Sequence, residues 1–244
     1  MLYTAVSALC VMLAFPRAGL WPLALVGLVP LFLSLKDAAG LGRAFLRGFV
    51  FGLLLVAGMG WWLFPAIVGQ YEKPWWAAAV FVPLLVGLPF GLVYGLFGAA
   101  FRALYRPGLF FAALAAPSLW VLAEYAKEAW GLLVPWAVLG YAAAPFAPLL
   151  STAGWWGLYG ITFVLAAVNG LLFHACLQAR GGDKAARRAA LSTALAFLAV
   201  ALPAAGGALW RPPEAQKDLP VAVVQGNFSQ KERWSGMGVT NRVR

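Results

Sequence analysis

The feature that most constrains this chain is a set of long apolar stretches without charged side chains. One of them, residues 152–178, contains no Asp, Glu, Lys or Arg. A stretch of about 20 such residues can cross the roughly 30 Å of bilayer hydrocarbon as an α-helix. Hydrophobic residues make up 63% of the 244 residues and charged residues only 11%. A water-soluble fold has no place for that surplus, so we expect a polytopic membrane protein.

The apolar segments predict an all-α polytopic membrane helix bundle with about seven spans. The fourth segment is longer than a simple crossing needs, and Pro83 and Pro89 predict that it is kinked or divided. Glycines at four-residue spacing, such as Gly48 and Gly52, predict close packing between helices. The expected spans are residues 2–15, 21–35, 44–64, 75–104, 109–125, 155–177 and 189–210.

Basic residues between the spans predict the orientation. The positive-inside rule places the loops richer in Lys and Arg in the cytoplasm. This puts the N-terminus inside and everything after Trp210 outside. The net charge of +10 is thus a topological signal, and no nucleic-acid partner is expected. One set of alternate loops holds Lys36, Arg43, Arg47, Arg102, Arg106, Arg180, Lys184, Arg187 and Arg188, and the other holds Arg17, Lys73 and Lys127.

One outer connection, residues 129–151, is apolar and also rich in proline. Apolar segments with irregular backbone lie in the membrane interface or re-enter the membrane. They are tolerated there only if protein covers their backbone amides. We therefore expect this connection to lie in the interface or to re-enter the membrane, with protein covering its backbone amides.

The composition changes after Trp210 and divides the chain into three parts. Residues 1–210 form the bundle, residues 211–220 read as an exit linker, and residues 221–244 begin an extramembrane domain. Val221-Ala-Val-Val224 is typical of a buried strand, followed by turn residues. One strand cannot bury a core, so we expect a larger domain that is interrupted at Arg244.

Five short motifs follow one another along the chain. The last of them runs from residues 221–227 to Lys231 and Trp234. The others are residues 13–16 (Leu-Ala-Phe-Pro) with Trp21 and Pro22, residues 48–52 leading to Trp61 and Trp62, residues 116–120 (Ala-Pro-Ser-Leu-Trp) followed by Glu124, and residues 134–136 (Val-Pro-Trp) with Gly140 and Tyr141. In this order and spacing, the motifs resemble the bacterial apolipoprotein N-acyltransferase family.

The resemblance implies a helix bundle in the bacterial inner membrane that carries a periplasmic α/β domain of the nitrilase-like (carbon–nitrogen hydrolase) type. A Glu-Lys-Cys triad in that domain takes an acyl group from a phospholipid as a thioester and passes it to the α-amino group of a diacylated lipoprotein. No cofactor is implied. The residue types suit this chemistry, since Glu serves as base, Lys stabilises the oxyanion and the Cys thiolate is both nucleophile and leaving group.

The chain departs from the family pattern because the three catalytic residues of the family lie beyond Arg244. No catalytic residue can therefore be carried over to this sequence. Cys10 and Cys176 do not substitute, since both lie in predicted spans without visible activation. They are also too far apart in sequence to suggest a metal site. We expect this truncated start of the enzyme to perform no acyl transfer alone.

By resemblance, four residues are candidates for substrate and lipid access: Trp136, Tyr141, Glu124 and Trp234. Each also has a simpler explanation. Trp136 is placed where an interfacial anchor would lie, and Trp234 could pack inside the nitrilase-like domain. Glu124 lies three residues before Lys127, so it either forms a local ion pair or binds a lipid head group.

Two other classes of function compete with the acyltransferase interpretation. A lipid-translocating or transport protein would place polar clusters inside its spans, and this chain places almost none there. A non-catalytic scaffold would need a finished tail after Trp210, whereas a single strand leaves unpaired edges. The DNA after the Arg244 codon separates these classes, because only a frame that continues into a nitrilase-like domain supports the acyltransferase. Oligomeric state and lipid preference stay open.

Overall fold

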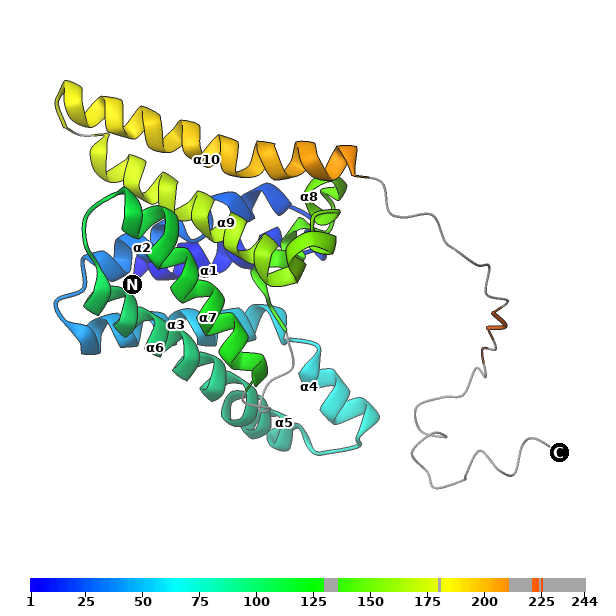
Figure 1. The fold of residues 1–244 in the computed structure, drawn as a ribbon. Helices are drawn as coiled ribbons and strands as arrows, with labels where there is room; N and C mark the ends of the chain where they lie inside the picture. The colour runs from blue at the N-terminus through cyan, green and yellow to red at the C-terminus, as the bar shows by residue number, and fades with distance from the viewer. Residues whose placement is uncertain (130–135, 180, 211–220, 224, 226–244) are drawn as a thin grey trace.

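The computed structural model describes residues 1–129, 136–179, 181–210, 221–223 and 225. Within these residues the regular structure is helical (Figure 1), and no strand is present. Four helical stretches are long and apolar enough to cross a membrane, and two shorter apolar ones accompany them. The four are Leu41–Met59 (α3), Trp75–Leu104, Ala153–Gln178 (α9) and Asp183–Leu209 (α10), and the two shorter ones are Leu2–Ala14 (α1) and Trp21–Lys36.

The tail after Trp210 is described only at residues 221–223 and 225. Val221, Ala222 and Val223 form no strand. The rest of the predicted nitrilase-like start, including Trp234, lies outside the described residues, so this domain stays a prediction.

The second apolar segment is a broken helix. It starts as a 3-10 helix, Trp21–Leu25, and continues after a turn as α2, Val29–Lys36. Asn169 of α9 compensates for the break, because its side chain donates to the Ala24 carbonyl at 2.7 Å and accepts the Leu28 N–H at 2.7 Å. A buried amide side chain thus satisfies backbone groups that a continuous helix would pair internally.

The long fourth segment remains one helical stretch and is not divided at its prolines. It consists of α5 (Trp75–Phe81), a π-helical stretch (Val82–Gly87) and α6 (Leu88–Leu104). A proline lacks an N–H and clashes with the preceding turn of an α-helix, and wider π-helical turns are a common local adjustment. Pro83 lies at the start of the π-helical stretch, which accommodates it without ending the helix.

Helices α3 and α6 pack with their backbones in close approach, as the glycine spacing predicts. A Cβ atom added at Gly52 would lie 2.6 Å from the Phe90 carbonyl oxygen and 3.0 Å from the Gly91 Cα. At Gly48 an added Cβ would overlap the Tyr94 carbonyl. Only glycine permits this distance between the two helices.

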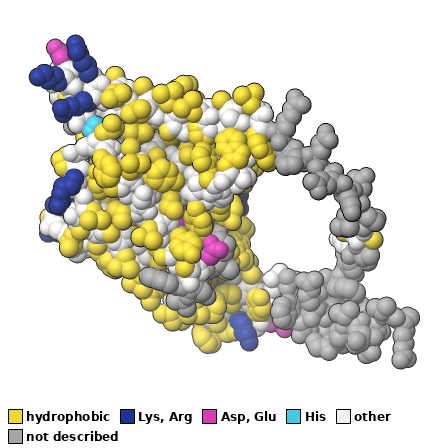
Figure 2. Space-filling view, in the orientation of Figure 1, with side chains coloured by type: hydrophobic (Ala, Val, Ile, Leu, Met, Phe, Trp, Pro, Cys, Tyr) yellow, Lys and Arg dark blue, Asp and Glu magenta, His cyan; other side chains and the backbone are white. Residues whose placement is uncertain are grey.

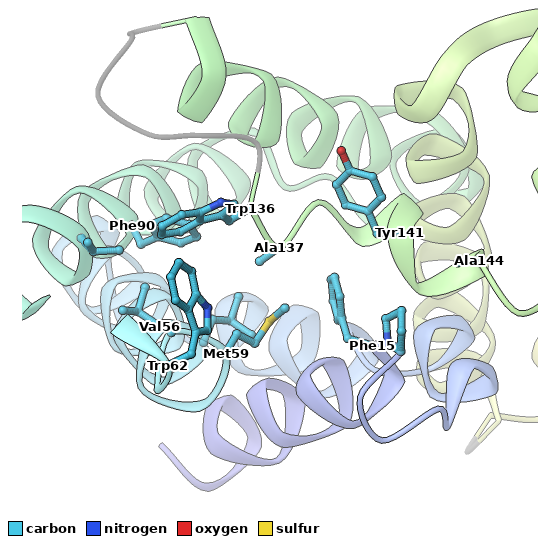
Figure 3. A pocket seen from close by; sticks show the side chains of 13 residues that line it. Phe15, Val56, Met59, Trp62, Phe90, Trp136, Ala137, Tyr141 and Ala144 are labelled. Carbon is cyan, nitrogen blue, oxygen red and sulfur yellow. The ribbon is translucent and has the colours of Figure 1, made fainter. Parts of the chain in front are cut away.

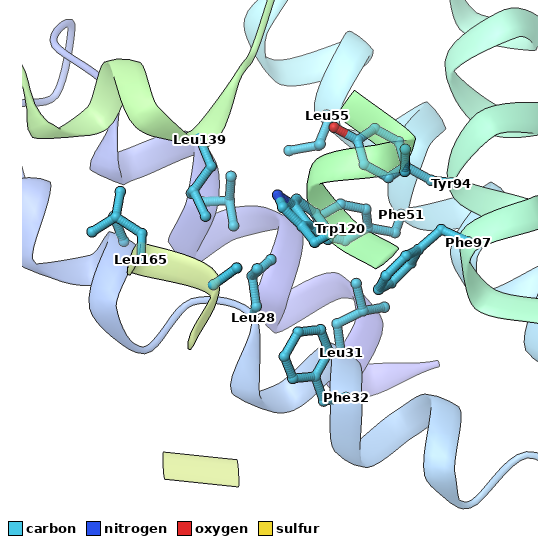
Figure 4. Close-up of a cluster of buried hydrophobic side chains, with 14 of the residues drawn as sticks. Leu28, Leu31, Phe32, Phe51, Leu55, Tyr94, Phe97, Trp120, Leu139 and Leu165 are labelled. Carbon is cyan, nitrogen blue, oxygen red and sulfur yellow. The ribbon is translucent and has the colours of Figure 1, made fainter. Parts of the chain in front are cut away.

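An aromatic cluster fills the centre of the bundle (Figure 4). Trp120 of α7 (Ala116–Ala129) is almost fully buried, and its ring centroid lies 5.2 Å from those of Tyr94 and Phe97. Phe51 of α3 meets Trp120 edge to face at 5.9 Å. These contacts join α3, α6 and α7 into one core, which fixes the frame around the cavity described below.

The basic loops gather at one end of the bundle. Figure 1 shows the α2–α3, α6–α7 and α9–α10 connections at the same side, and Figure 2 shows Lys and Arg side chains concentrated there. Two of these arginines bind backbone carbonyls at the C-terminal end of α2. Arg102 donates to the Ala38 carbonyl at 3.0 Å, and Arg47 donates to the Ser34 carbonyl. Much of the remaining visible surface is apolar, as expected for a lipid-facing bundle (Figure 2).

Candidate functional site

An apolar cavity of about 440 Å³ lies between the end of α1, the C-terminal half of α3, the first turns of α6 and the segment that follows the undescribed residues 130–135. Figure 3 shows the aromatic side chains around it. Its volume falls in the range of about 300–1,000 Å³ that is usual for small-molecule sites. The lining includes Phe15, Val56, Met59, Trp62, Phe90, Trp136 and Tyr141.

Trp136 and Tyr141, two of the predicted access residues, line this cavity together. The Trp136 ring meets Trp62 edge to face, with ring centroids 5.1 Å apart. Trp62 and Tyr141 are each more than two-fifths exposed, so the cavity has an open side. Exposed apolar walls of this kind favour an apolar ligand.

Glu124 does not line the cavity but lies beneath the segment that does. Its side chain is 1% exposed. Both carboxylate oxygens accept the Leu139 N–H, at 3.0 Å and 3.2 Å. A buried carboxylate is costly unless it is hydrogen-bonded, and here the irregular backbone supplies the donor.

Lys127, one turn further along α7, binds the same segment through its ammonium group. Its Nζ donates to the Trp136 carbonyl at 3.3 Å, to the Ala137 carbonyl at 3.4 Å and to the Tyr94 hydroxyl at 2.9 Å. It also lies 5.1 Å from the ring centroid of Phe90, a lining residue of the cavity. Lys127 thus links the cavity wall on α6 to the segment opposite it.

The hydroxyl of Thr162 in α9 completes this set by accepting the Gly140 N–H at 3.1 Å. Three side chains from two helices therefore bind four backbone groups of the segment. The prediction that protein covers the backbone of this outer connection is confirmed for these groups. The sequence analysis treated Lys127 as an outer-loop charge and as an ion-pair partner, whereas it is buried on α7. Nothing in the sequence marked Thr162. We call Glu124, Lys127 and Thr162 the loop-anchoring residues.

Among the described residues, the local ion pair considered for Glu124 does not form, and the remaining candidates do not line the cavity. Glu124 and Lys127 do not form a direct ion pair within 4 Å in the described part of the chain, because each turns to the backbone instead. Cys10 and Cys176 are both free thiols, on α1 and α9, and neither lines the cavity. Trp234 lies outside the described residues.

The lining of the cavity suits the binding of a ligand better than covalent catalysis. Among its described lining residues the polar side-chain atoms are the Tyr141 hydroxyl and the indole nitrogens of Trp62 and Trp136. Acyl transfer needs an activated nucleophile with a base in reach. The lining supplies apolar contact surface and a phenol, so the geometry suits an apolar ligand.

Comparison with known proteins identifies the family. The family model described as "Apolipoprotein N-acyltransferase N-terminal domain" matches residues 7–171, which is more than half of the chain. The chain belongs to the apolipoprotein N-acyltransferase family. This confirms the resemblance drawn from the short motifs. Every residue that lines the cavity lies between Phe15 and Ala144, inside the matched range.

Curated relatives extend the match over most of the chain. An apolipoprotein N-acyltransferase of Geobacter metallireducens is 29% identical over 238 residues, covering 96% of this chain and 44% of the relative. One of Photobacterium profundum is 30% identical, covering 91% and 41%, and one of Allorhizobium ampelinum is 34% identical, covering 84% and 37%. The chain thus spans less than half the length of these relatives.

Proposed function

We propose that this chain is the membrane portion of an apolipoprotein N-acyltransferase and that the cavity beside Trp136 holds an acyl chain of the phospholipid donor. The apolar cavity with an exposed aromatic side carries the proposal. In this arrangement the chain presents the donor lipid and a diacylated lipoprotein acceptor to a nitrilase-like domain. That domain, which residues 221–244 would begin, supplies the Glu-Lys-Cys chemistry. Without it, the 244 residues perform no transfer.

The shared position of the basic loops supports one orientation in the membrane. Seven crossings with the basic end in the cytoplasm of a bacterial inner membrane place the cavity toward the periplasm, where lipoproteins would arrive. Reporter fusions test this order. Alkaline phosphatase joined after Glu72 should be active, and the same enzyme joined after Arg106 should be inactive. The reverse pattern would contradict the orientation.

The buried charges support this function over transport. A transport path would expose Glu124 or Lys127 to a water-filled cavity. Both side chains are instead about 1% exposed and bind the backbone around Trp136 and Leu139. The two side chains therefore hold the backbone of the cavity wall in place.

Photo-crosslinking tests the acyl site. The purified chain is reconstituted with a phospholipid that carries a diazirine near the end of one acyl chain, and labelled peptides are mapped after illumination. We expect enriched labelling of the C-terminal half of α3 and of residues 136–144. The Ala144→Trp variant fills the cavity and should reduce this labelling several-fold. Trp75→Ala, which alters an exposed tryptophan away from the lining, is the matched control.

Uniform labelling of all lipid-facing helices, unchanged by Ala144→Trp, would contradict the acyl site. A melting temperature measured for each variant excludes unfolding as the cause of lost labelling. The site proposal and the family assignment can fail separately, because the family assignment does not depend on the cavity.

A further inference from the structure

A second cavity, of about 530 Å³, lies at the basic end of the bundle. It is bounded by residues 107–109, where a bend leads into a helix, by the last turns of α9 and by the first turns of α10. It shares no lining residue with the cavity beside Trp136. The lining comprises Pro107, Gly108, Leu109, His174, Gln178, Arg188, Leu191 and Ser192.

One part of the wall of this basic-end cavity is polar and hydrogen-bonded. The His174 Nδ1 lies 2.8 Å from the Ser192 hydroxyl, which in turn donates to the Arg188 carbonyl at 2.9 Å. His174 and Ser192 are buried, whereas the Arg188 side chain is exposed. This hydrogen-bonded pair holds α9 against α10 and fixes the position of the helical turn that carries Arg188.

Three cations occupy the first turns of α10, and none has an acidic partner among the described residues. Lys184, Arg187 and Arg188 are exposed, and the salt bridge found in the described part of the chain joins Lys36 to Asp37 instead. Asp183 begins the same helix and offsets one of the three charges. The mouth of the cavity therefore keeps a net positive charge.

An apolar trough of about 500 Å³ continues from this mouth along the same helices, with Leu109 in the lining of both. On α10 the combined lining runs from Arg188 to Pro203, which corresponds to about 22 Å at 1.5 Å per residue. One leaflet contributes about half of the roughly 30 Å hydrocarbon core, so the trough is deep enough for an acyl chain. The trough is lined by Leu109, Ala113, Phe163, Ala167, Leu171, Leu195, Leu198, Ala199, Leu202 and Pro203.

We propose that the basic-end cavity and the trough together bind one anionic phospholipid, with its phosphate at Arg188 and an acyl chain between α9 and α10. A guanidinium binds phosphate oxygens in a bidentate manner, and each nearby Lys or Arg adds attraction for an anionic head group. A free phosphate would leave the trough unused. A zwitterionic lipid would bring a cationic group among three cations.

This lipid differs from the acyl donor of the proposed function, because the two sites lie at different ends of the bundle. Under the orientation proposed above, it belongs to the cytoplasmic leaflet. Helix α10 packs mainly on α9 and is otherwise exposed along much of its length (Figure 1). A bound lipid would fill the trough beside α10 and stabilise its contact with the bundle.

Native mass spectrometry of the purified 244-residue chain tests the proposal. The chain is titrated with phosphatidylglycerol or with phosphatidylcholine of identical acyl chains, and the bound fractions are compared. We expect preferential retention of one phosphatidylglycerol. Arg188→Gln should weaken its binding about fivefold, as expected for loss of one interfacial cation. Arg43→Gln, at the same end but outside the lining, should leave binding unchanged.

A second variant and a soluble competitor complete the experiment. Ala199→Trp fills the trough and should weaken binding of phosphatidylglycerol without removing a charge. Glycerol phosphate without acyl chains should not displace the lipid. Equal retention of both lipids, an equal effect of Arg43→Gln, displacement by glycerol phosphate, or a second copy of the chain in place of the lipid would each overturn the proposal.

Discussion

At the scale of single residues, the bundle uses its two most deeply buried charges to hold backbone in place. Glu124 and Lys127 lie one turn apart on α7, and each binds the segment that forms one wall of the cavity. Their opposite charges also attract one another across the short gap. Removing Glu124 leaves the Lys127 charge and the Leu139 N–H unsatisfied, and removing Lys127 leaves the Glu124 charge and two backbone carbonyls unsatisfied, in a dry environment.

Glu124→Ala should therefore destabilise the chain. The Leu139 N–H would lose its acceptor, and an unsatisfied buried donor costs about 1–3 kcal/mol. Glu124→Gln keeps one acceptor oxygen and should cost less. The measurement is the midpoint of thermal unfolding in detergent, followed by tryptophan fluorescence. Glu128→Ala removes only an exposed hydrogen bond with Tyr159 and is the control, so equal losses at the two positions would contradict this role.

A double-mutant cycle tests the electrostatic link. Lys127→Met alone should destabilise by about 3–5 kcal/mol, the usual cost of breaking a buried charge pair at one partner. The combination with Glu124→Gln should cost less than the sum of the two single variants, because no uncompensated charge remains. Unfolding free energies of the four proteins give the coupling directly. Strict additivity would show that the two groups act independently.

At the scale of elements, the sequence predicted where helices lie better than how they are interrupted. Hydrophobic runs located the apolar stretches, with boundaries that differ by up to six residues, as at the start of α10. Length and polarity alone decide which segments can be buried in lipid. The break in the second segment depends on Asn169, which is about 140 positions away in sequence. No local sequence pattern indicates that Asn169 bonds the backbone at this break.

In the candidate site, too, the sequence predicted the location of the segment but not the residues that hold it. Proline and tryptophan marked the segment around Trp136, and the need to cover its amides followed from general physics. The identity of the covering side chains did not follow, because Glu124 and Lys127 also fit a local ion pair at their spacing. Trp62 was noted in the sequence as part of a family motif, and only the three-dimensional packing brings its ring to 5.1 Å from that of Trp136.

The contact between α3 and α6 gives a prediction at this scale. Gly52→Ala would force the Phe90 backbone away and should destabilise the chain by about 1–3 kcal/mol, the usual range for overpacking. Since Phe90 also lines the cavity, labelling by the diazirine lipid should fall as well. Gly42→Ala is the matched control on the same helix, because its added Cβ meets no atom within 4 Å. Equal unfolding midpoints for the two variants would contradict the close approach.

At the scale of the whole molecule, the proposed function assigns lipid binding to the bundle and the chemistry to another domain. The cavity offers an apolar lining and hydrogen-bonded walls, while the reactive groups that the family requires are expected in a nitrilase-like domain. Assigning the apolar bundle and the reaction to separate parts keeps a reactive thiolate out of the hydrocarbon, where its charge would be costly. The family match over residues 7–171 agrees with the first of these two parts.

This division predicts how the chain behaves alone and in combination. The purified 244 residues should transfer no acyl group from phospholipid to a diacylated lipopeptide. A chimera in which this chain replaces the matching part of the Geobacter metallireducens relative should transfer it, because the relative supplies the catalytic domain. Trp136→Ala in the chimera should lower the rate, and Trp75→Ala should not. Mass spectrometry of the lipopeptide measures the product. Turnover by the 244 residues alone, or an inactive but folded chimera, would contradict the assignment of this chain as a membrane platform.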